Sequence, residues 1–173
     1  QLLVELGITT VFVTHDQDEA FVLGDRVAVL AEGRVVQVGS PAELYTDPAT
    51  RWLAGFVGDA NFVRGDASGG SARTAIGDVP LLRAADGAID VLIRPEHLDL
   101  TAAGDATGDG PDAAAGVVEL VEYVGHDTTY LVALGESRLR VRRPSAPVLQ
   151  RGDRAVVRYL GGPAVTFDAN SSE

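Results

Sequence analysis

The chain has 173 residues, a formal net charge of −11 and no cysteine. The negative balance disfavours nucleic acid as the main partner, because such binding depends on neutralising phosphates with basic side chains. The missing cysteines exclude disulfides and thiolate chemistry, and no apolar run approaches the ~20 residues that a membrane-spanning helix needs. Methionine is absent too, so we take Gln1 not to be a natural start and expect a C-terminal piece of a longer protein.

The first 58 residues have the pattern of an α/β fold. Residues 8–14 form a nearly continuous β-branched, apolar run, which is typical of a strand buried on both faces of a parallel sheet. Asp16 and Glu19 follow with the spacing of a helix capping box. Glu32-Gly33 predicts a hairpin turn between two further strands, and Ser40 has the position of an N-cap for a short helix.

The pattern changes near Gly58-Asp59. Beyond this point the apolar runs are short and are separated by glycine, proline and aspartate, which favours a small β-barrel or sandwich. The strands we expect cover residues 62–64, 73–76, 89–93, 117–123, 128–134, 138–142, 154–159 and 164–167. Residues 101–116 contain only Thr, Ala, Gly, Asp and Pro, so they have nothing to bury and predict a flexible loop.

His15 is the first candidate for chemistry. It lies where the expected strand ends and the capped helix begins, and ligands of open α/β sheets bind at the carboxyl ends of strands. A histidine there can donate a hydrogen bond to a phosphate oxygen or orient a nucleophilic water. Judged from its position alone, a local hydrogen-bonding role is the more common one.

Other polar residues favour structural roles. His97 and His126 are far apart in sequence and have no third soft ligand, so we expect no metal site. Arg138, Arg140 and Arg142 alternate along one strand and share a face. They could bind an anion or a partner subunit, but a solvated face is more common. Arg94 ends a strand and is expected to bind a carboxylate or loop carbonyls.

The residues around His15 resemble a known family. Residues 11–20 (VFVTHDQDEA) closely resemble the switch-histidine segment of ABC transporter ATPases. The segments that close the nucleotide-binding domain of importer ATPases are matched, in order, by DRVAVL at 25–30, GRVVQVGSP at 33–41 and YTDP at 45–48. The match is most like the subgroup that serves uptake of sugars, polyamines and ferric ion. Asp18 and Phe21 depart from the usual residues, but neither alters the histidine.

The second part resembles the regulatory TOBE domain of the same subgroup, which is OB-like. The similar segments are LIRPEHL at 92–98, VELVEYVGHDT at 118–128 and RGD at 151–153. The stretch 123–127 is somewhat more similar to ferric-ion than to sugar importers. The resemblance implies a mixed fold class: an incomplete α/β end of an ABC nucleotide-binding domain at 1–58, then an all-β small barrel at 59–173 with a flexible loop at 101–116.

The resemblance implies that this is the C-terminal, regulatory portion of an ATPase subunit of a binding-protein-dependent importer, with ferric ion or polyamine as candidate solutes. His15 would be the switch histidine, both catalytic and in contact with the γ-phosphate of ATP. ATP and magnesium would be the cofactors of the full-length parent, and none is expected in this fragment. Without lysine there is no phosphate-binding loop, and the signature motif and catalytic glutamate would lie upstream. The fragment should therefore not hydrolyse ATP by itself.

The implied partners are membrane-embedded permease subunits and a second ATPase subunit in a homodimer. A periplasmic or extracellular solute-binding protein would take part only indirectly, and the subunit would lie peripherally at the cytoplasmic face of the membrane. The alternative is an OB-like module that serves mainly oligomerisation or small-anion sensing.

Overall fold

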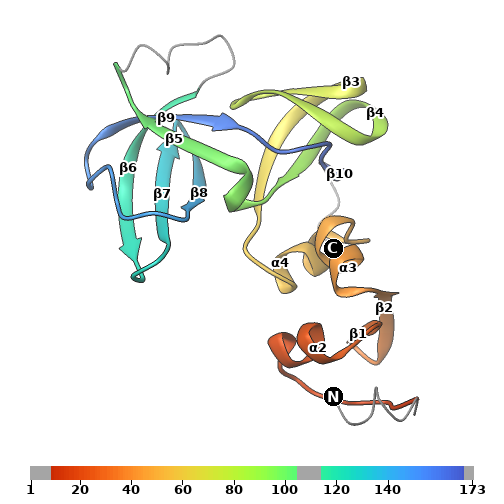
Figure 1. Cartoon of the computed structure of the whole chain (residues 1–173). Helices are drawn as coiled ribbons and strands as arrows, with labels where there is room; N and C mark the ends of the chain where they lie inside the picture. The colour runs from red at the N-terminus through yellow and green to blue at the C-terminus, as the bar shows by residue number, and fades with distance from the viewer. Residues whose placement is uncertain (1–8, 105–113, 170–173) are drawn as a thin grey trace. The chain divides into compact units, whose positions relative to one another are not determined.

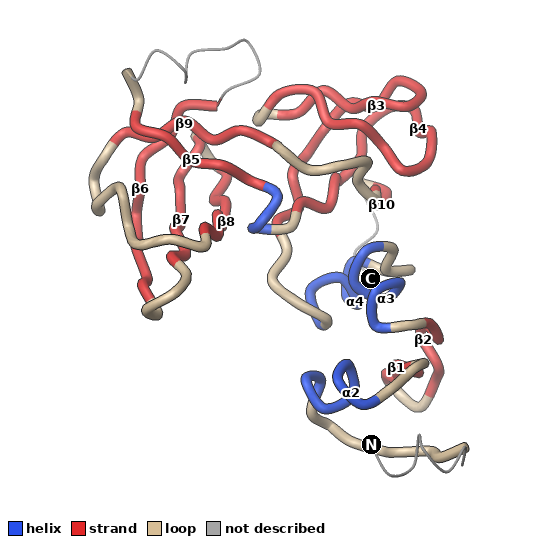
Figure 2. Tube along the Cα trace, in the orientation of Figure 1, coloured by secondary structure: helices blue, strands red, loops and turns tan. Residues whose placement is uncertain are grey.

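The structure is a computed structural model that describes residues 9–104 and 114–169. Its contacts divide the chain into two compact units, Gln1–Val57 and Gly58–Glu173, called here the first and the second unit. Most of the regular structure is β-strand, and the helices are few and short (Figures 1 and 2).

The first unit is built around one antiparallel hairpin. Its elements, in chain order, are α2 (Gln17–Leu23), β1 (Val27–Ala31), β2 (Arg34–Gly39), α3 (Pro41–Thr46) and α4 (Arg51–Phe56) (Figure 1). β1 pairs with β2, and the expected two-residue turn is confirmed, since Glu32 and Gly33 have φ of 50° and 74°. Positive φ at both central residues is what a type I′ turn requires.

Helix α3 begins with a complete capping box, as the sequence predicts. The Ser40 hydroxyl accepts the N–H of Glu43, and the Glu43 carboxylate accepts the N–H of Ser40 at 2.7 Å. The Ser40 N–H and the Ser40 hydroxyl, which lies 3.1 Å from Glu43 Oε2, both donate to the ionised carboxylate and lower the pKa of Glu43. The helix thereby directs Leu44 into a small core that also holds Val29, Leu53 and Val57.

The strand expected at residues 8–14 is wrong over its described part. Residues 9–14 form no strand, and Val11 and Val13 are 88% and 89% exposed. A strand needs neighbours that satisfy its backbone N–H and C=O groups, and the only described sheet of the first unit is the hairpin β1–β2. The α/β sheet expected for 1–58 is therefore not formed among the described residues.

The second unit contains two antiparallel sheets. The smaller one has the order β10-β4-β3 and is dominated by the hairpin of β3 (Asn61–Thr74) and β4 (Gly77–Ile93), with β10 (Thr166–Asp168) on the other edge of β4. This hairpin is longer than predicted: it includes residues 65–72, which are small and lack the β-branched side chains that identify a strand. The η1 turn (Pro95–His97) leads to the larger sheet.

The larger sheet has the order β5-β9-β6-β7-β8. Its strands are β5 (Leu98–Ala102), β6 (Ala114–Tyr123), β7 (Thr128–Leu134), β8 (Ser137–Arg143) and β9 (Arg154–Tyr159). The edge strands β5 and β8 also contact each other, and Arg143 Nη1 donates to the carbonyl of Leu100 at 2.6 Å. The sheet thus curls toward closure, as in a small barrel.

The loop expected at 101–116 is wrong at both ends. Residues 101–102 belong to β5 and residues 114–116 to β6, where Ala102 and Gly116 both face Ala155 in the register. Backbone pairing suffices to hold these small residues in a sheet, although they offer little to bury. Residues 105–113 lie outside the described residues.

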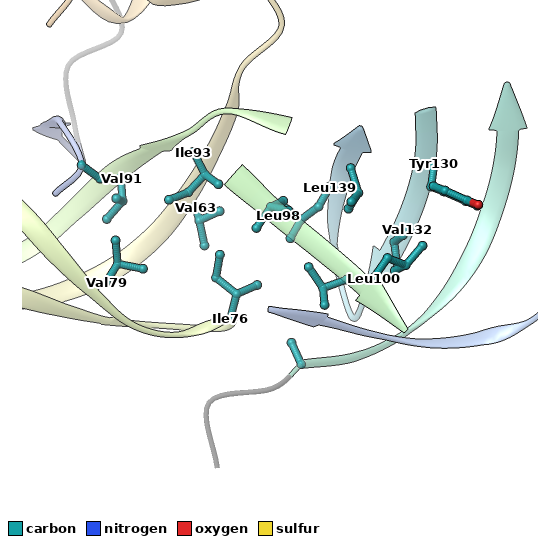
Figure 3. Packing of buried hydrophobic residues seen from close by; sticks show 14 of the residues in the cluster. Val63, Ile76, Val79, Val91, Ile93, Leu98, Leu100, Tyr130, Val132 and Leu139 are labelled. Carbon is teal, nitrogen blue, oxygen red and sulfur yellow. The ribbon is translucent and has the colours of Figure 1, made fainter. Parts of the chain in front are cut away.

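One apolar core joins the two sheets of the second unit (Figure 3). Val63, Val79 and Val91 come from the β3–β4 hairpin, and Leu100 and Val132 come from the larger sheet. Tyr130 is fully buried with them. Its hydroxyl accepts the N–H of Val148 at 2.9 Å, which satisfies the one polar atom that this side chain brings inside.

Candidate functional site

The candidate site is His15, which lies one residue before the N-cap of helix α2. Asp16 is the N-cap of this helix, and its carboxylate Oδ1 accepts the N–H of Asp18 at 2.9 Å and of Glu19 at 3.1 Å. Asp16 therefore satisfies two of the helix's otherwise unpaired donors. The capping role expected for Asp16 is confirmed.

The second half of the expected capping box is replaced by a different contact. In such a box, Glu19 would accept the N–H of Asp16. Here the Thr14 hydroxyl lies between them: it accepts the Asp16 N–H at 3.0 Å and donates to Glu19 Oε2 at 2.8 Å. Reasoning from the sequence missed this contact, because a threonine five residues before a glutamate is not a recognised helix-start pattern.

The His15 side chain is exposed. Among the residues that the structure describes, none forms a hydrogen bond with its ring. An imidazole in this state can direct a ring N–H at an anionic oxygen, or hold a water by donating or accepting. The site as described consists of this single functional group on a hydrogen-bonded helix start.

The arginines of β8 are paired with carboxylates. Arg138 Nε bonds to Glu119 Oε2 at 2.7 Å, and this contact raises the pKa of Arg138. Arg140 Nη1 and Arg142 Nη2 reach the two oxygens of Asp59 at 2.8 Å and 3.0 Å. The three arginines alternate along one strand, as predicted. Their guanidinium groups, which an anion would need, are already bound to Glu119 and Asp59.

The first residues of the second unit are held by a set of bonds, called here the stem contacts. Arg94 Nη1 donates to the carbonyls of Gly58 at 3.2 Å and Asp59 at 3.1 Å, which confirms the structural role expected for Arg94. Asn61 exchanges two bonds with the backbone of Arg140: its Nδ2 donates to the carbonyl at 2.8 Å, and its Oδ1 accepts the N–H at 2.7 Å.

The two remaining histidines lie in different surroundings. His97 meets the edge of the Tyr159 ring at 6.4 Å between centroids, and His126 Nε2 lies 3.6 Å from Asp127. Within residues 9–104 and 114–169, no group of three His, Asp or Glu side chains is placed to hold a metal ion. No described helix is long and apolar enough to cross a membrane.

Comparisons with known proteins agree with the resemblance. Residues 91–167 match the TOBE domain family. The chain is 39% identical to the Fe(3+) ions import ATP-binding protein FbpC 2 of Rhodococcus jostii, over 96% of this chain and 48% of that protein. It is 40% identical to the spermidine/putrescine import ATP-binding protein PotA of Pseudomonas fluorescens, over 91% of this chain and 45% of that protein. The chain thus spans about half the length of these relatives.

One solved structure has a similar fold. The cytoplasmic molybdate-binding protein ModG aligns with a TM-score of 0.51 and 14% sequence identity, over 62% of this chain and 95% of that chain. At this identity the likeness concerns the fold alone. The family resemblance inferred from the sequence is confirmed: the chain is related to the ATP-binding subunits of ABC importers and carries a TOBE domain.

Proposed function

We propose that this chain, as a relative of ABC importer ATP-binding subunits with a TOBE domain, is the C-terminal and regulatory part of a subunit that couples ATP hydrolysis to solute uptake. The observation that carries the proposal is the match over most of the chain, which includes the segment around His15. Residues 1–58 would complete an α/β nucleotide-binding domain whose other strands lie outside this chain. Val11 and Val13 are exposed in this chain, and such a missing sheet would cover their side chains.

His15 is the switch histidine in this proposal. Its ring N–H donates to an oxygen of the γ-phosphate of ATP, and the imidazole holds the attacking water in line. Phosphoryl transfer depends on positioning and charge stabilisation by several groups together, and His15 supplies one of them. Among the described residues no group of three or more His, Asp or Glu side chains could hold a metal ion, and the proposal assigns magnesium to no residue of this chain.

The parent subunit would pair with a second copy and dock on membrane-embedded permease subunits at the cytoplasmic face. The relatives named for Fe(3+) and for spermidine/putrescine import make a ferric ion or a polyamine the proposed solute class. Oligomerisation or small-anion sensing as the main function is not favoured. The β8 arginines that an anion would use are paired with Glu119 and Asp59.

The test is steady-state ATP hydrolysis by the longer subunit carrying His15→Ala. Turnover should fall by ~10²-fold or more, the usual scale for removing one positioned polar group. The affinity for ATP should stay nearly intact, because the contact strengthens as charge moves in the transition state. His126→Ala is the matched control, since His126 is an exposed histidine of the second unit. Normal turnover in His15→Ala would overturn the proposal.

A further inference from the structure

The two residues next to His15, Thr14 and Asp16, take part in a closed ring of hydrogen bonds with Glu19. The Thr14 hydroxyl donates to Glu19 Oε2 at 2.8 Å and accepts the N–H of Asp16 at 3.0 Å. Asp16 Oδ1 in turn accepts the N–H of Glu19 at 3.1 Å. The ring therefore runs from residue 14 to 19 to 16 and back to 14, and His15 lies between its members 14 and 16.

In this arrangement the Thr14 hydroxyl both donates and accepts a hydrogen bond within the helix start. Its single proton is donated to Glu19, and one of its two lone pairs accepts the Asp16 N–H. The peptide group between His15 and Asp16 is thereby connected, through the Thr14 side chain, to Glu19 in the first turn of α2. A reacting side chain gains from such a fixed base, because errors of about 1 Å in a reacting group can cost ~10²-fold in rate.

We propose that Thr14 and Glu19 are positioning residues for His15. They touch neither substrate nor the reacting atoms; they set the direction in which the imidazole leaves the chain. The inference rests on the proposed function, since it takes His15 as the group that orients the attacking water. It predicts that the hydroxyl of residue 14 matters for turnover, while the methyl group does not.

The first experiment measures kcat and KM for ATP in the longer subunit. Thr14→Val keeps the shape and removes the hydroxyl, and we expect a loss of kcat of ~10-fold or more with KM within about twofold, since positioning acts on the barrier. Thr14→Ser restores the hydroxyl and should recover most of the loss. Glu19→Ala should behave as Thr14→Val. Asp18→Asn is the matched control: Asp18 contributes its backbone N–H to the helix start, and this group is unchanged by a substitution of the side chain.

The outcomes separate the two ideas. If His15→Ala is impaired while Thr14→Val turns over ATP normally, the positioning role is refuted and the proposed function stands. If His15→Ala is itself normal, the proposed function fails, whatever Thr14→Val does. An equal loss in Thr14→Val and Thr14→Ser also refutes the positioning role, because the hydroxyl would then not be the group that matters.

A second measurement needs no ATP. In this chain, the Asp16 amide proton is hydrogen-bonded to the Thr14 hydroxyl. Its hydrogen exchange, followed by NMR, should become faster in Thr14→Val and stay unchanged in Thr14→Ser. Slow exchange of this amide in Thr14→Val would show that the ring does not hold the backbone, and would overturn the inference independently of any kinetics.

Discussion

Asn61 connects the start of the second unit to an edge of its larger sheet. Arg140 lies opposite Leu131 in the β7–β8 register, and its own N–H and C=O are taken by the Asn61 side chain at 2.7 Å and 2.8 Å. The amide thus acts as a one-residue substitute for a neighbouring strand. Asn61→Ala removes both bonds at once from a position that is 5% exposed.

The expected cost follows from the number and kind of bonds. A typical hydrogen bond contributes about 0.5–1.5 kcal/mol net, and a backbone group left unpaired in a buried place costs about 1–3 kcal/mol. Two bonds lost together should lower the free energy of unfolding of the second unit by about 2–3 kcal/mol. Asp59→Ala also removes two contacts, with Arg140 and Arg142, but these side chains are 37–54% exposed. Exposed ion pairs contribute about 0.2–1 kcal/mol each.

The neutral Asn61 amide should therefore contribute more to the free energy of unfolding than the Asp59 carboxylate with its two ion pairs. Urea denaturation followed by far-UV circular dichroism measures both variants, with Ser137→Ala as the control at an exposed position of the same strand. Added salt should shrink the effect of Asp59→Ala and leave that of Asn61→Ala unchanged. A larger loss in Asp59→Ala than in Asn61→Ala would refute this reasoning.

Two further predictions concern other parts of the chain. Gly116→Ala should destabilise the second unit by about 1–3 kcal/mol in the same assay, because the added Cβ would overlap the carbonyl oxygen of Ala133. Gly70→Ala is the control and should cost far less, since the space around Gly70 is open. Equal losses of stability in the two variants would contradict this prediction. Because the folded-state pKa of Glu43 lies below its ordinary 4.5, its contribution to the stability of the first unit is present above that value and is lost as pH falls through the folded pKa. In an acid titration followed by Trp52 fluorescence, the stability of the first unit should therefore fall less steeply with pH in Glu43→Gln than in the unchanged chain. An equally steep fall in the variant would show that the Glu43 carboxylate does not contribute to this stability.

The sequence predicts most where local signals and tertiary structure agree. Strands β7 and β9 have the expected bounds, since apolar side chains alternate or run together there, and the caps at Asp16 and Ser40 follow from side-chain chemistry. The length of the β3–β4 hairpin was underestimated, because its middle consists of small residues without a strand-like pattern. Gly65 lies so close to Thr74 that an added Cβ would sit 3.1 Å from its methyl carbon, a long-range constraint that no local pattern contains.

The candidate site was predicted only in part, for the same physical reason. His15 and the Asp16 cap follow from the local sequence, but the bond from Thr14 to Glu19 depends on how the chain turns before α2. The strand expected at residues 8–14 had the right composition and lacks a described neighbour to pair with. The bonds of Asn61 with Arg140 and of Asp59 with Arg142 join residues about eighty positions apart, a pairing that composition and spacing do not encode.

The central claim is that His15 works only as one part of a larger nucleotide site. It is tested most directly by titrating ATP with magnesium into the present chain and into the longer subunit, while the His15 ring signals are followed by NMR. We expect saturable shifts of His15 in the longer subunit and none in the present chain, because the phosphate-binding loop with its lysine is absent here. Saturable shifts of His15 in the present chain, or their absence in the longer subunit, would contradict the account.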